Sequence, residues 1–215
     1  MTLNVQSLAS SPRRRRGPSP LEGERVRPLS RGQVEDRWQE LGDLYAETSG
    51  VGPGQWARSR TAFLRRLAVD VRQPGFGLLI AEAVVRDETS VLTGCAYGFP
   101  VRVDGPWWQG LDGCLPRPLL SLAASGGLFA VSGILVPERV RAYDQDREWN
   151  LARRLQKRLL TDHDGALGVF LVDRGDTGTL DALRSWGWRS VAAEPRDDGL
   201  LGVPSGPRRA LVVDP

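Results

Sequence analysis

The sequence predicts a mixed α/β fold in a single domain, and three observations lead to this prediction. Short apolar runs with strand character alternate with segments whose apolar residues recur at helical spacing. Glycine-rich or polar breaks separate these segments. The chain has 215 residues, enough for one domain that buries roughly 70% of its unfolded surface. One compact α/β domain is therefore expected.

The first half of the chain predicts a strand, two helices and a hairpin. Residues 25–29 have the pattern of a short first strand. Apolar side chains then recur at helical spacing on either side of a glycine-rich break: Val34, Trp38, Leu41 and Tyr45, then Trp56, Phe63, Leu67 and Val71. We expect these aromatic residues in the core. Two apolar runs, 76–85 and 91–101, are joined by a short polar segment and predict an antiparallel hairpin.

The second half predicts alternating strands and helices. A buried strand at Leu128–Val136 is stopped by Pro137, and a helix follows with its leucines on one face. The later elements are a strand at 167–173, a short helix that ends in 184–188, and two strands at 189–193 and 209–214. The Pro- and Gly-rich segment 104–127 and the segment 136–150 are expected to be loops.

Charge and composition restrict the classes of function. Residues 1–20 hold Arg13, Arg14, Arg15 and Arg16 and no acidic residue, so the rest of the chain, with 25 basic and 26 acidic residues, is nearly neutral. We expect residues 1–23 to form a disordered tail and residues 24–215 to form the domain. Nucleic-acid binding through this tail is an alternative. No signal peptide or apolar span is evident, which indicates a cytoplasmic protein.

Neither cysteine has a partner at metal-ligand spacing. Cys95 and Cys114 are far apart, with no nearby Cys or His to complete a zinc site or a disulfide framework. They are expected to be buried thiols, and no metal is expected.

The start of the helix that follows residue 150 has the composition of an anion site. Free N–H groups and a partial positive charge at a helix N-terminus bind phosphate. Arg147, Arg153 and Arg154 flank this turn, and Asn150 and Ala152 are small enough for a close approach to the backbone. An amphipathic helix with a solvated arginine face would show a similar pattern.

Two motifs resemble the GCN5-related N-acetyltransferase (GNAT) family. The series Arg147, Asn150, Ala152 resembles the family's pyrophosphate-binding motif of Gln or Arg, two residues, Gly, one residue, and Gly or Ala. The series Trp186, Gly187, Trp188 resembles the end of its fourth helix. The resemblance covers about residues 24–214. It implies a mostly antiparallel sheet of about seven strands flanked by about four helices, with splayed fourth and fifth strands.

The resemblance also implies a function and a site. Family members transfer an acetyl group from acetyl-CoA to a primary amine, here of a small molecule or a protein, by direct attack. The pantetheine arm would pair with the backbone of Ile134, Leu135 and Val136. The residues implied for the rest of the cofactor are Arg147, Asn150, Leu151, Ala152, Arg153 and, where the family commonly has Asn, Asp176. No membrane partner is implied, and the chain would be a monomer or homodimer.

The usual acid and base of the family are replaced in this chain. Leu183 stands where a tyrosine usually protonates the thiolate, and Gly133 stands where a glutamate is often found. The candidates that remain are Glu82, Tyr97, Tyr143 or an ordered water. A degenerate domain that binds acyl-CoA or a partner protein without turnover is therefore the alternative.

Two adjacent tryptophans suggest an acceptor site. Trp107 and Trp108 lie in the long predicted loop 104–127. They could form a wall of the acceptor pocket or cover an exposed edge of the sheet.

Overall fold

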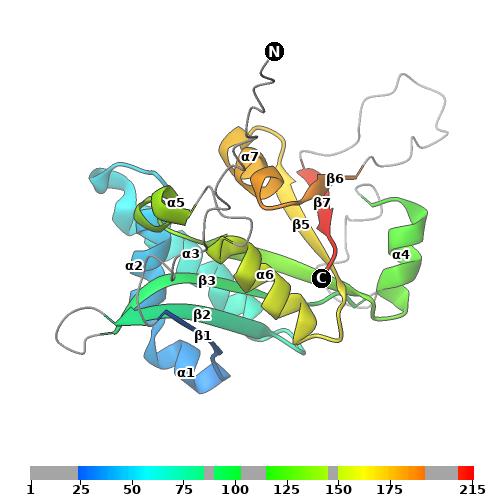
Figure 1. Cartoon of the computed structure of the whole chain (residues 1–215), viewed down its shortest axis with the longest axis horizontal. Helices are drawn as coiled ribbons and strands as arrows, with labels where there is room; N and C mark the ends of the chain where they lie inside the picture. Colours follow the sequence, from blue (N-terminus) through cyan, green and yellow to red (C-terminus); the bar gives the residue numbers. More distant parts are fainter. Residues whose placement is uncertain (1–23, 85–89, 103–114, 145–149, 192–207) are drawn as a thin grey trace, which may run out of the picture.

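The computed structural model describes residues 24–84, 90–102, 115–144, 150–191 and 208–215. In this part of the chain a seven-stranded sheet has the order β1-β2-β3-β4-β5-β7-β6 (Figure 1). The strands are β1 (Arg25–Pro28), β2 (Gly77–Val84), β3 (Ser90–Pro100), β4 (Leu128–Leu135), β5 (Leu167–Asp173), β6 (Arg189–Ser190) and β7 (Arg208–Val213). All neighbouring strands pair antiparallel except β4 and β5, which are parallel.

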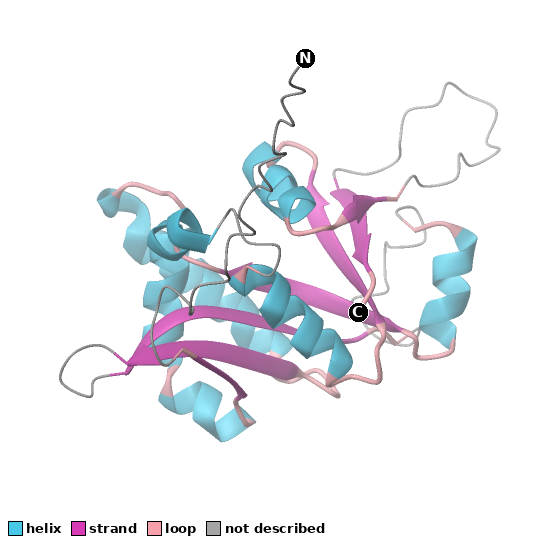
Figure 2. Ribbon diagram, viewed as in Figure 1, coloured by secondary structure: helices cyan, strands magenta, loops and turns pink. Residues whose placement is uncertain are grey.

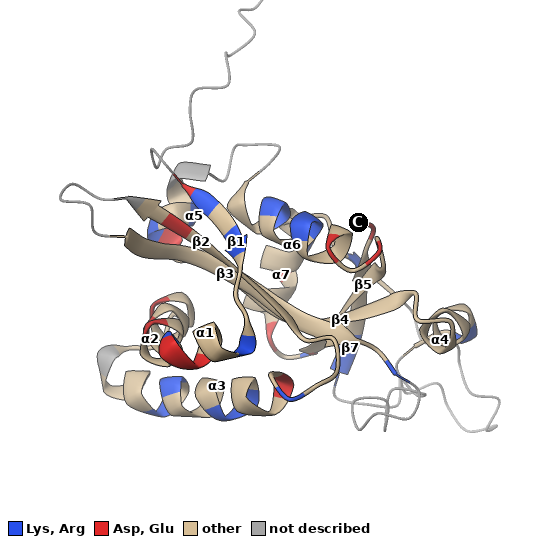
Figure 3. Ribbon diagram, turned by 90° about the horizontal axis from the view of Figure 1, so that it is seen from below, with Lys and Arg blue, Asp and Glu red and all other residues tan. Residues whose placement is uncertain are grey.

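Helices cover both faces of this sheet (Figure 2). They are α1 (Arg31–Asp36), α2 (Trp38–Thr48), α3 (Trp56–Asp70), α4 (Arg117–Ala124), α5 (Glu138–Asp144), α6 (Leu151–Thr161) and α7 (Thr177–Ser185), with a 3-10 turn η1 (Pro53–Gln55) before α3. Figure 3 shows α1, α2 and α3 on one face and α6 on the other. None of the helices in the described ranges is both long enough and apolar enough to cross a membrane.

Each face of the sheet has its own hydrophobic core. On one face, Phe63 and Leu67 of α3 and Leu41 of α2 are fully buried against β2 and β3. On the other, Leu155 and Leu159 of α6 pack on β2, β3 and β4. The helical spacing of these residues predicted their burial, and the prediction is confirmed for them. The expected core position is wrong for Trp56, whose side chain at the start of α3 is 45% exposed.

The parallel pair β4–β5 is short, and this divides the sheet. Only residues 128–130 of β4 pair with residues 167–169 of β5. Beyond them, β4 pairs only with β3, while β5 pairs with β7. The two strands therefore diverge from Val131 onward, which confirms the predicted fold class with splayed fourth and fifth strands.

A β-bulge lies in β4 where this divergence begins. Tyr97 of β3 pairs with Gly133 and Gly98 pairs with Val131, so Ser132 is the extra residue. The strands approach so closely here that a Cβ on Gly98 would stand 2.0 Å from the carbonyl oxygen of Ala130. A bulge redirects the side chain that it carries. Here the bulge places Ser132 near Asp70, the last residue of α3.

The structure has seven α-helices in the described ranges, where about four were expected. Helices α4 and α5 lie in segments that we expected to be loops, and a break at Arg37 divides the first predicted helix. Ala123 of α4 is buried, and Val140 of α5 joins the core beside α6. Short helices of this kind carry too few apolar residues to give a clear helical period. Tertiary packing stabilises them instead.

Candidate functional site

A cavity of about 560 Å³ lies where β4, α5, α6 and α7 meet. Val136, immediately after β4, forms one wall, and Asn150, Leu151 and Ala152 at the start of α6 form another. The end of α7 closes the far side through Ala182, Ser185 and Trp186. The structure thus brings together four of the residues predicted for acyl-CoA binding. Ile134 and Leu135 precede Val136 on β4, whereas Arg147 lies outside the described residues.

The first turn of α6 is partly capped by its own side chain. The Oδ1 atom of Asn150 accepts a hydrogen bond of 3.0 Å from the backbone N–H of Arg153. Such an N-cap satisfies one of the N–H groups that a helix start leaves without an intrahelical partner. A phosphate that used the Arg153 N–H would have to displace the Asn150 amide.

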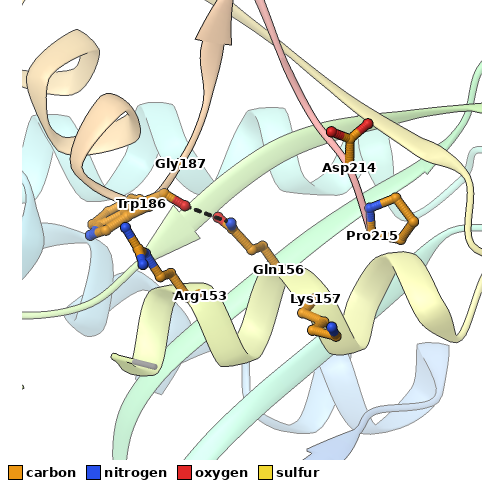
Figure 4. A pocket seen from close by; sticks show the side chains of 7 residues that line it. All are labelled: Arg153, Gln156, Lys157, Trp186, Gly187, Asp214 and Pro215. Carbon is orange, nitrogen blue, oxygen red and sulfur yellow. Dashed lines mark hydrogen bonds between the residues drawn. The ribbon is translucent and has the colours of Figure 1, made fainter. Parts of the chain in front are cut away.

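Hydrogen bonds from α6 hold the end of α7. The Arg153 guanidinium donates to the Ser185 carbonyl at 2.9 Å. The Gln156 amide donates to the Trp186 carbonyl at 2.9 Å, and this bond is the dashed line in Figure 4. The indole N–H of Trp188 donates to the other end of the Gln156 amide at 2.8 Å. A second, smaller cavity of about 240 Å³ lies beside these groups. These contacts fix the α7 wall of the larger cavity.

Two arginines of α5 have different surroundings. Arg139 pairs with Glu47 at 2.6 Å and donates to the Leu92 carbonyl at 3.2 Å, so its charge is compensated. Arg141 lines the larger cavity, and its buried Nε atom has no hydrogen-bond partner among the described residues. Buried polar atoms are normally hydrogen-bonded. Arg141 therefore offers the cavity a cationic donor suited to an anion.

Glu82, one of the predicted bases, has a structural role. Its carboxylate forms ion pairs with Arg27 at 2.7 Å and with Arg37. Glu82 lies on β2, and β3 separates this strand from β4. Burial alone would raise the pKa of Glu82, but hydrogen bonds and charges from the two arginines outweigh burial and lower it. A lowered pKa weakens a general base.

Tyr97 is buried beneath β4. Its side chain is 4% exposed, and burial raises the pKa of its phenol well above the usual value, so it stays protonated. Its ring occupies the space beside Gly133, where a Cβ would stand 2.5 Å from the ring atom Cε1 of Tyr97. No side chain fits at position 133 while the ring holds this place.

Of the remaining predicted site residues, Asp176 is described and the others are not. Asp176 caps α7, and its Oδ1 atom accepts a hydrogen bond of 3.0 Å from the Thr179 N–H. Tyr143 belongs to α5, but its side chain is outside the described part. Trp107, Trp108 and the tail of residues 1–23 also lie outside it.

Comparison with known proteins rests on structure. No family model matches the sequence, and no curated protein is similar to it. The chain superposes on a protein assigned to the GNAT acetyltransferase family from Desulfovibrio desulfuricans with a TM-score of 0.50 and 12% identity, over 89% of this chain and 98% of that one. The chain has the GNAT acetyltransferase fold.

Two further acetyltransferase structures have similar coverage. A GNAT-family acetyltransferase from Staphylococcus aureus shares 9% identity over 89% of this chain and 98% of that one, with a TM-score of 0.49. An acetyltransferase from Streptococcus agalactiae shares 10% identity over 90% and 99%, with a TM-score of 0.48.

Within this GNAT fold the structure explains two departures noted in the sequence. Gly133 is required by the Tyr97 ring, so a glutamate has no room there. Leu183 is 1% exposed and packs in the core beside α6, so it is a core residue.

Sequence reasoning missed three polar residues near the diverging strands, namely Asp70, Ser132 and Arg141. Ser132 could have been noticed as a polar residue inside an apolar strand. Asp70 carries no such signal, because its raised pKa comes from burial in the folded chain.

Proposed function

We propose that this protein is an N-acetyltransferase that transfers the acetyl group of acetyl-CoA to a primary amine of a small molecule or a protein. The observation that supports this best is the position of the larger cavity. It lies at the open end of the diverging strands β4 and β5, between the first turn of α6 and the end of α7. In the GNAT fold, this position joins an exposed strand edge to a helix N-terminus.

Each wall of the cavity suits one part of acyl-CoA. Beyond Ala130, the edge of β4 that faces β5 pairs with no strand in the described part. Amides of a pantetheine arm can extend such an edge as an added strand does. The pyrophosphate would meet the first turn of α6 and the Arg141 guanidinium, which provide N–H donors and positive charge. Arg147 stays a predicted contributor.

The reaction needs no nucleophilic side chain. Held beside the thioester, the acceptor nitrogen attacks the carbonyl carbon directly, and the CoA thiolate leaves. Fixing both reactants in this geometry supplies much of the acceleration. Donors directed at the thioester oxygen stabilise the charge that develops there.

The first experiment measures acetyl-CoA binding by the thermal shift of the full chain. A ligand at about a hundred times its dissociation constant stabilises the folded state by roughly 2.7 kcal/mol. Arg141→Gln should reduce the shift, because this side chain lines the cavity. Arg139→Gln is the matched control on the same helix, since Arg139 pairs with Glu47 instead. Equal shifts in both variants would argue against the cavity as the binding site.

The second experiment measures CoA release with a panel of amines. We would use amino acids, polyamines and short peptides with free N-termini, and detect the free thiol. A GNAT domain that only binds acyl-CoA is the second candidate, because Leu183 and Gly133 stand where the family usually has its acid and its base. Binding without release for every amine would favour that candidate.

A further inference from the structure

Helices α2 and α3 pack against each other on the sheet face opposite α6, and they carry opposite charges (Figure 3). Helix α2 contains three acidic residues and no basic residue, whereas α3 contains four arginines and one acidic residue. Their formal charges are therefore −3 and +3. Because the domain as a whole is nearly neutral, this layer concentrates charge of both signs on two neighbouring helices.

One side of α3 carries a stripe of exposed residues at steps of four, three and four positions: Arg58, Ala62, Arg65 and Val69. Residues at this spacing lie on one face of a helix. Arg58 and Arg65 form no ion pair with another residue of the described ranges. Val69, at 59%, is the most exposed large hydrophobic side chain among the described residues. The stripe therefore offers a partner two free cations with apolar surface between them.

The acidic residues of α2 are also accessible. The side chains of Glu40, Asp43 and Glu47 are 50%, 70% and 38% exposed. Each forms an ion pair with an arginine of its own chain, but ion pairs between exposed side chains are weak, so the carboxylates can take part in a further contact. Glu40 and Glu47 are seven residues apart, as are Arg58 and Arg65, which spaces both pairs by about 10.5 Å along their helices.

A partner that covers this layer must match both charges. A polyanion such as RNA, or an anionic membrane surface, would meet the α2 carboxylates beside α3, and these would repel it. A second copy of this chain, turned by a two-fold axis, presents an acidic helix to α3 and a basic helix to α2 at the same time. The charge pattern therefore favours a second copy over a partner of a single sign.

We infer that two copies of this protein associate through the α2–α3 layer, with α3 of each copy against α2 of the other. The α2 carboxylates then meet Arg58 and Arg65 of the other copy, and each contact occurs twice because the interface is isologous. The faces of two helices form a small interface rich in charge, so the dimer is weak and salt-sensitive. The inference does not depend on the proposed acetyl transfer.

The first test measures the oligomeric state of the full chain by sedimentation velocity over a series of concentrations. At low salt, the fraction of dimer should rise with concentration. In about 1 M NaCl, where the screening length falls to about 3 Å, most of the dimer should be lost. A wild type that stays monomeric at low salt, or a dimer that salt does not weaken, would overturn the inference.

Two charge-reversed variants give a sharper comparison. Arg58→Glu with Arg65→Glu changes the formal charge of α3 from +3 to −1, so both helices become acidic. Glu40→Arg with Glu47→Arg changes that of α2 from −3 to +1, so both become basic. Each variant alone should dimerise with a dissociation constant raised about tenfold or more, because like charges face each other in both contacts. An equal mixture of the two variants should associate more tightly than either alone.

The control is Arg174→Glu with Arg184→Glu. It reverses the same number of charges before and within α7, which packs with α6, and it should associate like wild type. Thermal melts check that each variant stays folded. A mixture that associates no better than its components would contradict this interface. If the wild type does not self-associate but binds polyuridylate, and the Arg58 and Arg65 variant does not, α3 is a nucleic-acid surface and the inference is wrong.

Discussion

Asp70→Asn should make the folded protein more stable at neutral pH. The folded state holds the Asp70 carboxyl with a pKa of about 6, raised by burial from a usual value of 3.8. Below pH 3.8 the carboxyl is protonated in both the folded and unfolded states and carries no penalty. Between pH 3.8 and about 6, the carboxyl ionises in the unfolded state but stays largely protonated in the folded state. Ionisation therefore stabilises the unfolded state over this range. The wild type loses stability over this window, and the asparagine variant does not.

The magnitude follows from the shift. A change of about two pKa units corresponds to about 3 kcal/mol. Because the carboxylate is only half-buried, solvent screening reduces this to about 1–2 kcal/mol. For a chain of this size, a gain of that magnitude raises Tm by about 5 °C.

The assay is urea unfolding of both variants at pH 4, 5, 6 and 7. The advantage of Asp70→Asn over wild type should be small at pH 4 and should grow to its full value by pH 7. An advantage that does not change with pH, or a variant that is less stable at pH 7 than at pH 4 relative to wild type, would refute the reasoning. Asp36→Asn is the control, because this exposed side chain should show no such growth.

Three further predictions concern stability. Gly98→Ala should cost about 3 kcal/mol in urea unfolding, because its Cβ would stand 2.0 Å from the Ala130 carbonyl oxygen; a cost below 1 kcal/mol would contradict this contact. Gln156→Leu should cost about 1–3 kcal/mol, since it leaves the buried Trp188 indole N–H without an acceptor, and a thermal melt would measure it. The pKa of Glu82 is lowered, so its stabilising effect is present above the usual value of 4.5 and is lost as pH falls. Glu82→Gln should accordingly flatten the acid side of the stability profile, and an unchanged profile would count against this ion-pair cluster.

The order of strands and helices could be predicted because each long element carries its own pattern. The leucines of α6 at helical spacing and the apolar run of β4 are local signals, and tertiary packing agrees with them. Helices α4 and α5 could not be predicted this way, because each is eight residues or fewer and depends on packing. The residues of the site could likewise be predicted only where they belong to such a local pattern. Asn150 and Ala152 lie on a strand-then-helix pattern, whereas Arg141 lines the cavity only because the short α5 forms.

Gly133 and Tyr97 are best understood as parts of one arrangement. A side chain at position 133 and the Tyr97 ring compete for one space on the α3 face of the sheet, and the ring holds it. With the ring there, β4 cannot present a carboxylate at the bulge. Ser132 is the extra residue of the bulge, and the Asp70 carboxyl lies near it at the end of α3. Because the Tyr97 ring fills the space beside position 133, Gly133→Glu alone should destabilise the fold and should not restore a working base at this position.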